Sequence, residues 1–151
     1  MGPVLREVVP SESYGSKGST KLYWVGRDRD RLVETYAWYS GRIYLQRLTR
    51  MPDGQFAISV VQFGPWARGQ HANADDLALA FYARGALLRI YSTLDIAGSP
   101  ERVAGSVSHY EVFKSVEGYE LNGSLSAFAA MTVDGRRLLF NPATGDLLNP
   151  R

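Results

Sequence analysis

The chain of 151 residues contains no cysteine, and this absence removes several classes of site together. Disulfide bonds, thiolate zinc sites, iron–sulfur clusters and a cysteine nucleophile all need that side chain. The sequence also lacks the phosphate-binding motifs GxxxxGKS/T and GxGxxG, the GxSxG elbow of hydrolases, the HExxH metal motif and an acidic EF-hand loop. We therefore expect no metal, no cofactor and no familiar type of active site.

Long apolar runs are also missing. The N-terminal segment 1–7 has neither the basic region nor the apolar core of roughly 7–15 residues that a secretory signal peptide needs. Nowhere do about 18 apolar residues follow one another, which is the length that a membrane-spanning helix requires. We therefore expect a cytoplasmic protein that does not bind a membrane.

What the chain does contain is the ordinary balance of a globular protein. Hydrophobic residues make up 45% of it and charged residues 21%, and both values are typical. A chain of this length can bury a core that is stable without a metal or a disulfide. We expect one domain over residues 21–151. Residues 1–20, rich in serine, glycine and proline, should form an arm that is flexible or ordered by a partner.

Charge is unevenly distributed along the chain, whose formal net charge is +2. Residues 1–70 contain ten Arg and Lys against six Asp and Glu, whereas residues 71–151 contain seven against nine. Clustered basic charge attracts anionic partners. The first half of the chain is therefore where we expect a partner to dock.

The first half also shows four short segments with the composition of β-strands. They are Lys21–Gly26, Leu32–Tyr39, Arg42–Arg50 and Gln55–Phe63. Turn signals at 27–30, 40–41 and 52–54 separate them and predict a four-stranded antiparallel meander. A helix over Asp28–Ser40 is the alternative. We favour the strand, because β-branched and aromatic residues dominate that segment.

After a loop at 64–70, the sequence carries its strongest helix pattern. Asn73 is a good N-cap, and Asp75 and Asp76 fall in the first turn, where the helix dipole favours negative charge. Apolar residues then recur at helical spacing, as Leu77, Phe81, Leu88 and Tyr91. We therefore predict a central helix from Ala74 to about Thr93.

Strands return after Ser99 and Pro100, a pair that is typical of a short helical turn. The predicted strands are Ser106–Val116, Ser124–Val133 and Arg136–Asn141, and 134–135 form a hairpin turn. The order of meander, helix and meander predicts an α+β fold, in which a curved sheet or half-barrel packs on the central helix.

His109, Tyr110 and Glu111 form the first candidate for chemistry. In a strand, alternation places His109 and Glu111 on one face and Tyr110 on the other. A histidine beside a carboxylate can act as a general base with its orienting partner. A catalytic or small-molecule pocket is therefore one hypothesis, and an ordinary exposed strand face opposite a core residue is the alternative.

His71, with Asp75 and Asp76, is the second candidate, at the predicted start of the helix. Histidine and carboxylates can bind a divalent metal, and a helix N-terminus can bind an anion. Adjacent residues of a helix point about 100° apart, however, and capping explains both aspartates. We therefore predict no metal site.

Aromatic and basic residues gather on one predicted sheet face in the first half. Alternation along 42–50 places Arg42, Tyr44 and Arg50 together, and pairing through the turn at 40–41 brings Tyr36 and Trp38 near them. Aromatic rings and guanidinium groups are enriched in protein interfaces, and they also stack on single-stranded nucleic acid. Burial of the same rings as core and cross-strand pairs is the structural alternative.

These observations predict a non-catalytic binding or assembly protein that docks a macromolecule through this basic, aromatic face. A protein partner or self-association is preferred, because the residue types match protein interfaces and catalytic motifs are missing. Two alternatives stay open: single-stranded nucleic-acid binding by the same face, and a pocket that uses His109 and Glu111.

Overall fold

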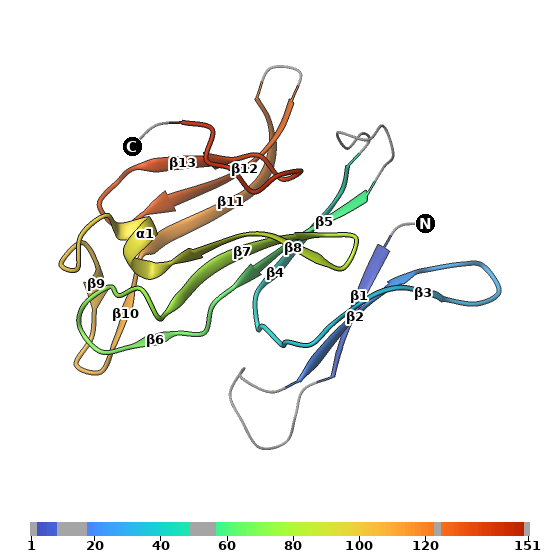
Figure 1. The fold of residues 1–151 in the computed structure, drawn as a ribbon, viewed down its shortest axis with the longest axis horizontal. Helices are drawn as coiled ribbons and strands as arrows, with labels where there is room; N and C mark the ends of the chain where they lie inside the picture. Colours follow the sequence, from blue (N-terminus) through green and yellow to red (C-terminus); the bar gives the residue numbers. More distant parts are fainter. Residues whose placement is uncertain (1–2, 9–17, 49–56, 123–124, 150–151) are drawn as a thin grey trace.

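Antiparallel β-strands make up almost all of the regular structure (Figure 1). This computed structural model describes residues 3–8, 18–48, 57–122 and 125–149. These ranges hold four sheets and one helix, α1 (Thr93–Ala97), which is five residues long. The predicted α+β fold is therefore wrong, and the described part of the protein is nearly all β.

Each sheet has a distinct place in the chain. The N-terminal sheet consists of β1 (Pro3–Val8), β2 (Ser19–Trp24) and β3 (Arg31–Tyr36). The central sheet consists of β4 (Ile43–Leu48), β5 (Ala57–Phe63), β7 (Leu77–Ala83) and β8 (Ala86–Ser92). The small sheet consists of β6 (Ala67–Arg68), β10 (His109–Glu111) and β9 (Ala104–Gly105). The C-terminal sheet consists of β11 (Phe113–Asn122), β12 (Leu125–Thr132) and β13 (Arg137–Phe140).

A β-hairpin takes the place of the predicted central helix. β7 and β8 pair in antiparallel register across Arg84 and Gly85, whose φ angles are 53° and 76°. Two successive positive φ angles are typical of a type I′ hairpin turn. β7 also pairs with β5. Of the apolar residues that suggested a helical stripe, Phe81 is thus buried in the sheet, and Leu77, Leu88 and Tyr91 are half-buried.

Residues 31–36 form a strand, β3, as predicted, and the helical alternative is wrong. The first meander nevertheless divides between two sheets, because β3 pairs with β2 whereas β4 pairs with β5. Ser40 holds the chain at this division. Its buried hydroxyl donates to the carbonyl of Phe63 at 2.6 Å and accepts from the amide of Arg42 at 3.2 Å. The predicted pairing through 40–41 is therefore absent, and the predicted curved sheet or half-barrel is wrong.

The central sheet is the middle layer of the fold. Every residue of β5 is buried, and a strand buried in this way has both of its faces covered. On one face, the C-terminal sheet contributes Phe128, Leu138 and Phe140 to the largest core cluster. The residues of the central sheet in that cluster include Val61, Phe63, Leu79 and Phe81.

The other face of the central sheet packs on the N-terminal sheet. Leu22 of β2 and Tyr36 of β3 lie in one buried cluster with Ile58 and Val60 of β5. Figure 1 shows the N-terminal and C-terminal sheets on opposite sides of the central one. β1 falls inside the predicted arm and pairs with β2, and the division of the chain at residue 20 stays a prediction.

α1 begins where the predicted helix was expected to end. The side chain of Ser92 caps it by accepting from the amide of Asp95. The side chain of Asp95 in turn accepts from the amide of Ser92, which completes a capping box. The guanidinium of Arg136 donates to the carbonyls of Ile96 and Ala97 at 3.0 and 2.8 Å, which ties the helix to the C-terminal sheet. Within the described ranges, no helix is long and apolar enough to span a membrane.

Two of the strands predicted for the second half are confirmed, since β12 and β13 fall within 124–133 and 136–141. The segment predicted as one strand at 106–116 instead divides between β10 of the small sheet and the start of β11 of the C-terminal sheet. The turn at 134–135 joins β12 to β13, and the amide of Gly135 donates to the carbonyl of Thr132 at 3.0 Å. Turn chemistry and alternation were sufficient to locate these strands.

Candidate functional site

The small sheet presents a polar outer face. Within β10, Tyr110 is 1% exposed and points into the core, whereas Glu111 is exposed and His109 is half-buried. The predicted alternation of these three residues is therefore confirmed. His109 pairs with Arg68 of β6, and paired residues share a face of the sheet. The outer face thus carries Arg68, His109 and Glu111.

Trp66, immediately before β6, lies on this face. Its side chain is 61% exposed, and its ring is stacked on the ring of His109 with centroids 4.4 Å apart and an interplanar angle of 27°. Tryptophan is among the residues enriched at protein interfaces, so an exposed tryptophan ring is a candidate contact for a partner. We name Trp66, Arg68, His109 and Glu111 the Trp66 face.

Gly64 determines how the chain reaches the Trp66 face. A Cβ atom at this position would lie 1.8 Å from the carbonyl oxygen of Leu77, which no other residue can tolerate without a backbone shift. The amide of Gly64 donates to the carbonyl of Ala78 at 3.0 Å. Gly64 thus continues the pairing of β5 with β7 at very close range, just before the chain leaves β5 toward Pro65 and Trp66.

A buried hydrogen-bond network supports the face from beneath. The hydroxyl of Tyr110 donates to Asp76 at 2.6 Å and lies 2.8 Å from the hydroxyl of Thr93. Burial, with the hydrogen bond to Asp76, raises the pKa of Tyr110. The side chain of Asn73 donates to the same carboxylate of Asp76 at 2.8 Å. These bonds join β10 to the segment before β7 and to α1, so the position of β10 is well defined.

The capping chemistry predicted for Asn73 exists without a helix after it. Its side-chain oxygen accepts from the amides of Asp75 and Asp76 at 2.9 and 2.8 Å. This is the pattern of an Asx turn, which uses the same bonds as an N-cap. The sequence signal was therefore real, but it marks a turn into β7.

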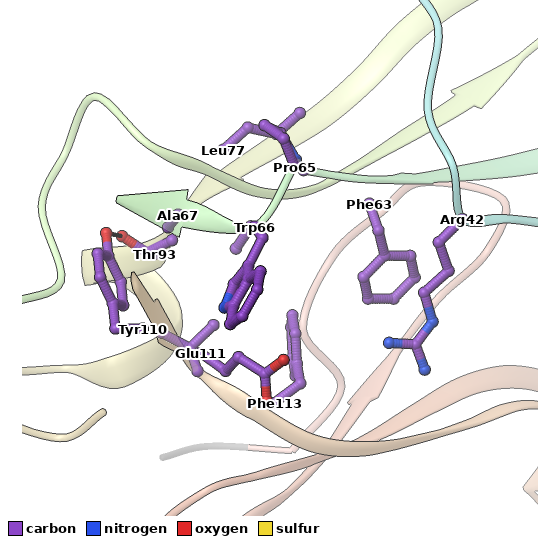
Figure 2. Close-up of a pocket in the computed structure, with 13 residues that line it drawn as sticks. Arg42, Phe63, Pro65, Trp66, Ala67, Leu77, Thr93, Tyr110, Glu111 and Phe113 are labelled. Carbon is purple, nitrogen blue, oxygen red and sulfur yellow. Dashed lines mark hydrogen bonds between the residues drawn. The ribbon is translucent and has the colours of Figure 1, made fainter. Parts of the chain in front are cut away.

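Three hollows include Trp66 in their lining, and two of them also include an arginine. The larger has a volume of about 680 Å³, and its lining includes Tyr39, Trp66, Arg68, Asp76 and His109. The smaller, of about 180 Å³, is shown in Figure 2, where Trp66 lies between an end formed by Tyr110 and an end formed by Arg42. The larger volume is within the roughly 300–1,000 Å³ that is usual for ligand sites.

The larger hollow contains one cationic donor, the guanidinium of Arg68. In the described part of the chain, no ion pair or hydrogen bond engages the guanidinium of Arg68, which is exposed. The Nδ1 atom of His109 lies 2.8 Å from the hydroxyl of Ser108, which leaves Nε2 for another partner. The Asp76 carboxylate, by contrast, already accepts from Asn73 and Tyr110. A ligand that offers acceptors would match this lining.

The binding residues predicted from the sequence do not form one exposed face. Tyr36 is 3% exposed and packs against Trp38 and Tyr82, with ring centroids 5.0 and 5.2 Å away. Tyr44 is half-buried and packs edge-on against Phe63. These three predicted aromatic residues thus serve the core, as the structural alternative had it. Whether any of them binds a partner stays untested.

The predicted basic residues have different fates. Arg42 is exposed, with its guanidinium carbon 5.1 Å from the ring centroid of Phe63, at the edge of the smaller hollow (Figure 2). Arg50 lies outside the described residues. Arg42 is therefore the one predicted binding residue that the described structure places beside Trp66.

The predicted catalytic trio is not assembled as a site. The described bonds of the His109 ring run to Ser108, and no hydrogen bond in this part of the structure joins it to Glu111. Tyr110 lies on the opposite face and is committed to Asp76. Among the described residues, no group of three or more His, Asp or Glu could hold a metal ion, and His71 is exposed.

Sequence reasoning missed Trp66 and Arg68 because both lie in a stretch that composition identified as a loop. Large aromatic residues in loops are candidates for binding, since loops lie on the surface. A tryptophan flanked by Pro65 and followed by an arginine was therefore an available signal.

Comparisons with protein-family models, with curated proteins and with solved structures found no match to this chain.

Proposed function

We propose that this is a non-catalytic binding or assembly protein that docks a partner protein, or a second copy of itself, on the Trp66 face. The observation that carries the proposal is the exposed, ordered indole of Trp66 on the ring of His109. Tryptophan and arginine are the residues most enriched among the side chains that dominate binding energy at protein interfaces. Arg68 and Arg42 lie on either side of this indole.

The rigid setting of Trp66 supports the same function. Its ring is stacked on His109, and the backbone two residues before it lies close against the carbonyl of Leu77 at Gly64. A side chain that is already fixed loses little conformational entropy when a partner covers it. Exposed apolar surface with such support is typical of an interaction site.

Single-stranded nucleic acid gains no comparable support. The two hollows are lined by Arg42 and Arg68, but also by the carboxylates of Asp76 and Glu111. A polyanion binds best where basic residues predominate along its path. A partner of mixed charge suits this lining better. The cytoplasmic location expected from the sequence stays a prediction.

A displayed library of random peptides, selected on the immobilised protein, tests the proposal. The Trp66→Ala variant should lose the selected peptides, with affinity weakened by about 30-fold or more, as for other tryptophans at interface centres. Leu87→Ala is the matched control, because Leu87 is 52% exposed but lies on β8, away from the small sheet. Light scattering over a range of concentrations tests self-association with the same two variants.

Two results would oppose this function. One is a set of selected peptides that binds Trp66→Ala and wild type equally well, together with an unchanged oligomeric state. The other is a fluorescent oligothymidylate that binds wild type in a salt-dependent manner and loses binding in Trp66→Ala, which would favour the nucleic-acid alternative.

A further inference from the structure

β6 is an edge strand with backbone groups directed away from its sheet. In the order β6-β10-β9, its one partner within the described residues is β10. Such an edge is a template for pairing with another chain. β6 is only two residues long, Ala67 and Arg68, so the direction of each backbone group can be worked out individually.

The hydrogen-bond pattern shows which backbone groups of β6 are directed outward. The amide of Gly69 donates to the carbonyl of Ser108 at 2.9 Å. In an antiparallel pair, hydrogen-bonded and non-hydrogen-bonded residue pairs alternate. Arg68, which lies opposite His109, is therefore in a non-hydrogen-bonded pair. Its N–H and C=O both point away from β10.

An independent bond supports this assignment. The carbonyl of His109 accepts from the amide of Ser106 at 2.8 Å, on the β9 side of β10. The backbone of His109 thus faces β9 and not β6, as the alternation requires. The outward groups of Arg68 lie beside the larger hollow, because Ala67 and Arg68 both line it.

The side chains around this edge add a charge preference. The Arg68 guanidinium has no ion-pair partner in the described ranges. The bond to Ser108 involves Nδ1 of His109, so the Nε2 atom of this ring can bond another group. Asp76, the acid of the hollow, accepts from Asn73 and Tyr110 on Oδ2. The Arg68 guanidinium therefore offers an incoming carboxylate a cation without an ion-pair partner in the described ranges.

We propose that an extended segment of the partner protein pairs with the edge of β6, bonding the outward N–H and C=O of Arg68, and places a carboxylate side chain on its guanidinium. The side chain two residues further along the segment, on the same face, packs on Trp66. This is recognition by strand addition, in which main-chain bonds supply affinity and side-chain positions supply specificity. The inference rests on the proposed function and names the chemistry of its partner.

The test uses peptides selected on the wild-type protein, made with a fluorescent label and measured by polarisation. Each peptide is compared with a version in which Asp or Glu is replaced by the matching amide, and with versions that carry an N-methyl group at one residue each. We expect the amide version to bind about tenfold more weakly, the usual loss for a charge-assisted bond. N-methylation should weaken binding at one position only, that of the residue whose N–H donates to the Arg68 carbonyl, because Arg68 is the residue of β6 whose backbone groups point outward.

The Arg68→Gln variant completes the design. It should weaken binding of the acidic peptide about tenfold and should not discriminate between the acidic and amide versions. Arg31→Gln is the control, since Arg31 is an exposed arginine of β3 in the N-terminal sheet. It should leave every affinity within about twofold of wild type.

The outcomes separate this inference from the function on which it rests. If no selected peptide depends on Trp66, the proposed function fails. If peptides depend on Trp66 but bind equally as acids and amides, or tolerate N-methylation at every position, only the strand-addition inference is overturned. Displacement of the peptides by oligothymidylate at low salt would also overturn it in favour of nucleic acid.

Discussion

Two tryptophans of this protein have opposite environments although an arginine follows each within four residues of the sequence. Trp38 packs against Tyr36 and Tyr82 between the N-terminal and central sheets. Trp66 stands 61% exposed on the small sheet. The first tryptophan belongs to the core and the second is placed for binding. Aromatic composition therefore does not distinguish a packing residue from a contact residue, whereas the covering of the ring by a second sheet does.

Replacing Tyr36 by alanine should show the largest effect. Tyr36 is 3% exposed, and its removal leaves a cavity beside Trp38 and Tyr82. We expect the free energy of unfolding to fall by about 3–5 kcal/mol, as for other buried aromatic residues. Urea denaturation measures the change, and Tyr36→Phe, which keeps the ring, should cost much less. A loss as small as that of an exposed residue would contradict the assignment of this cluster to the core.

Gly64→Ala should have the next largest effect on stability, because Gly64 lies close against β7 two residues before Trp66. The new Cβ would overlap the Leu77 carbonyl, 1.8 Å away, and the backbone must shift. We expect a loss of about 1–3 kcal/mol in the free energy of unfolding, with weaker binding of the selected peptides. Gly41→Ala is the matched control, since a Cβ there meets nothing within 4 Å. Equal stability of the two variants would show that the close approach of Gly64 to Leu77 does not require a glycine.

Alkaline pH should destabilise the protein through tyrosines whose pKa is raised by folding, and these include Tyr36 and Tyr82 in the buried cluster and Tyr110 beneath the Trp66 face. Burial first, and then the hydrogen bond with Glu34, raise the pKa of Tyr36, and burial raises the pKa of Tyr82. A tyrosine whose pKa is raised by folding stabilises the protein fully below about pH 10, and this contribution is lost as pH increases further. We expect Tyr36 to cost about 1.4 kcal/mol of stability by pH 11. Urea denaturation midpoints measured at about pH 8, 10 and 11 test this dependence.

The control for the alkaline prediction is Tyr36→Phe, which cannot ionise. Its stability should fall less steeply between about pH 10 and pH 11 than that of wild type. Parallel curves for the two proteins would mean that Tyr36 ionises as freely in the folded state as in the unfolded one.

Trp66→Ala should have the smallest effect on stability and the largest on binding. The exposed ring contributes only its stacking on His109, so we expect a loss of less than about 1 kcal/mol in the free energy of unfolding. Leu87→Ala provides the exposed apolar control. A loss near that of Tyr36→Ala would erase the difference between the two tryptophans and assign Trp66 to the core as well.

Part of the fold followed from local chemistry alone. Residues 31–36 were predicted as a strand because β-branched and aromatic residues favour a pleated, half-buried surface. The turn at 134–135 and the strands around it were predicted from hairpin chemistry. The alternation of His109, Tyr110 and Glu111 was also predictable, because successive side chains of any strand point to opposite faces.

The central hairpin was not predictable in the same way. β7 reads LALAFYA, which contains no β-branched residue, and it follows a genuine capping pattern at Asn73. Local propensity therefore favoured a helix. Pairing with β5 on one side and β8 on the other overrides that preference, because it makes β7 an interior strand of the sheet beside the fully buried β5.

The sequence by itself determined most of the extended segments outside the central hairpin and the turn at 134–135, because these depend on residues close together in the sequence. Only the tertiary structure decided which aromatic rings are buried. Trp38 is covered because two sheets meet over it, whereas Trp66, which follows the close approach of Gly64 to β7, is left exposed. Both outcomes depend on contacts between distant segments, which no local pattern encodes.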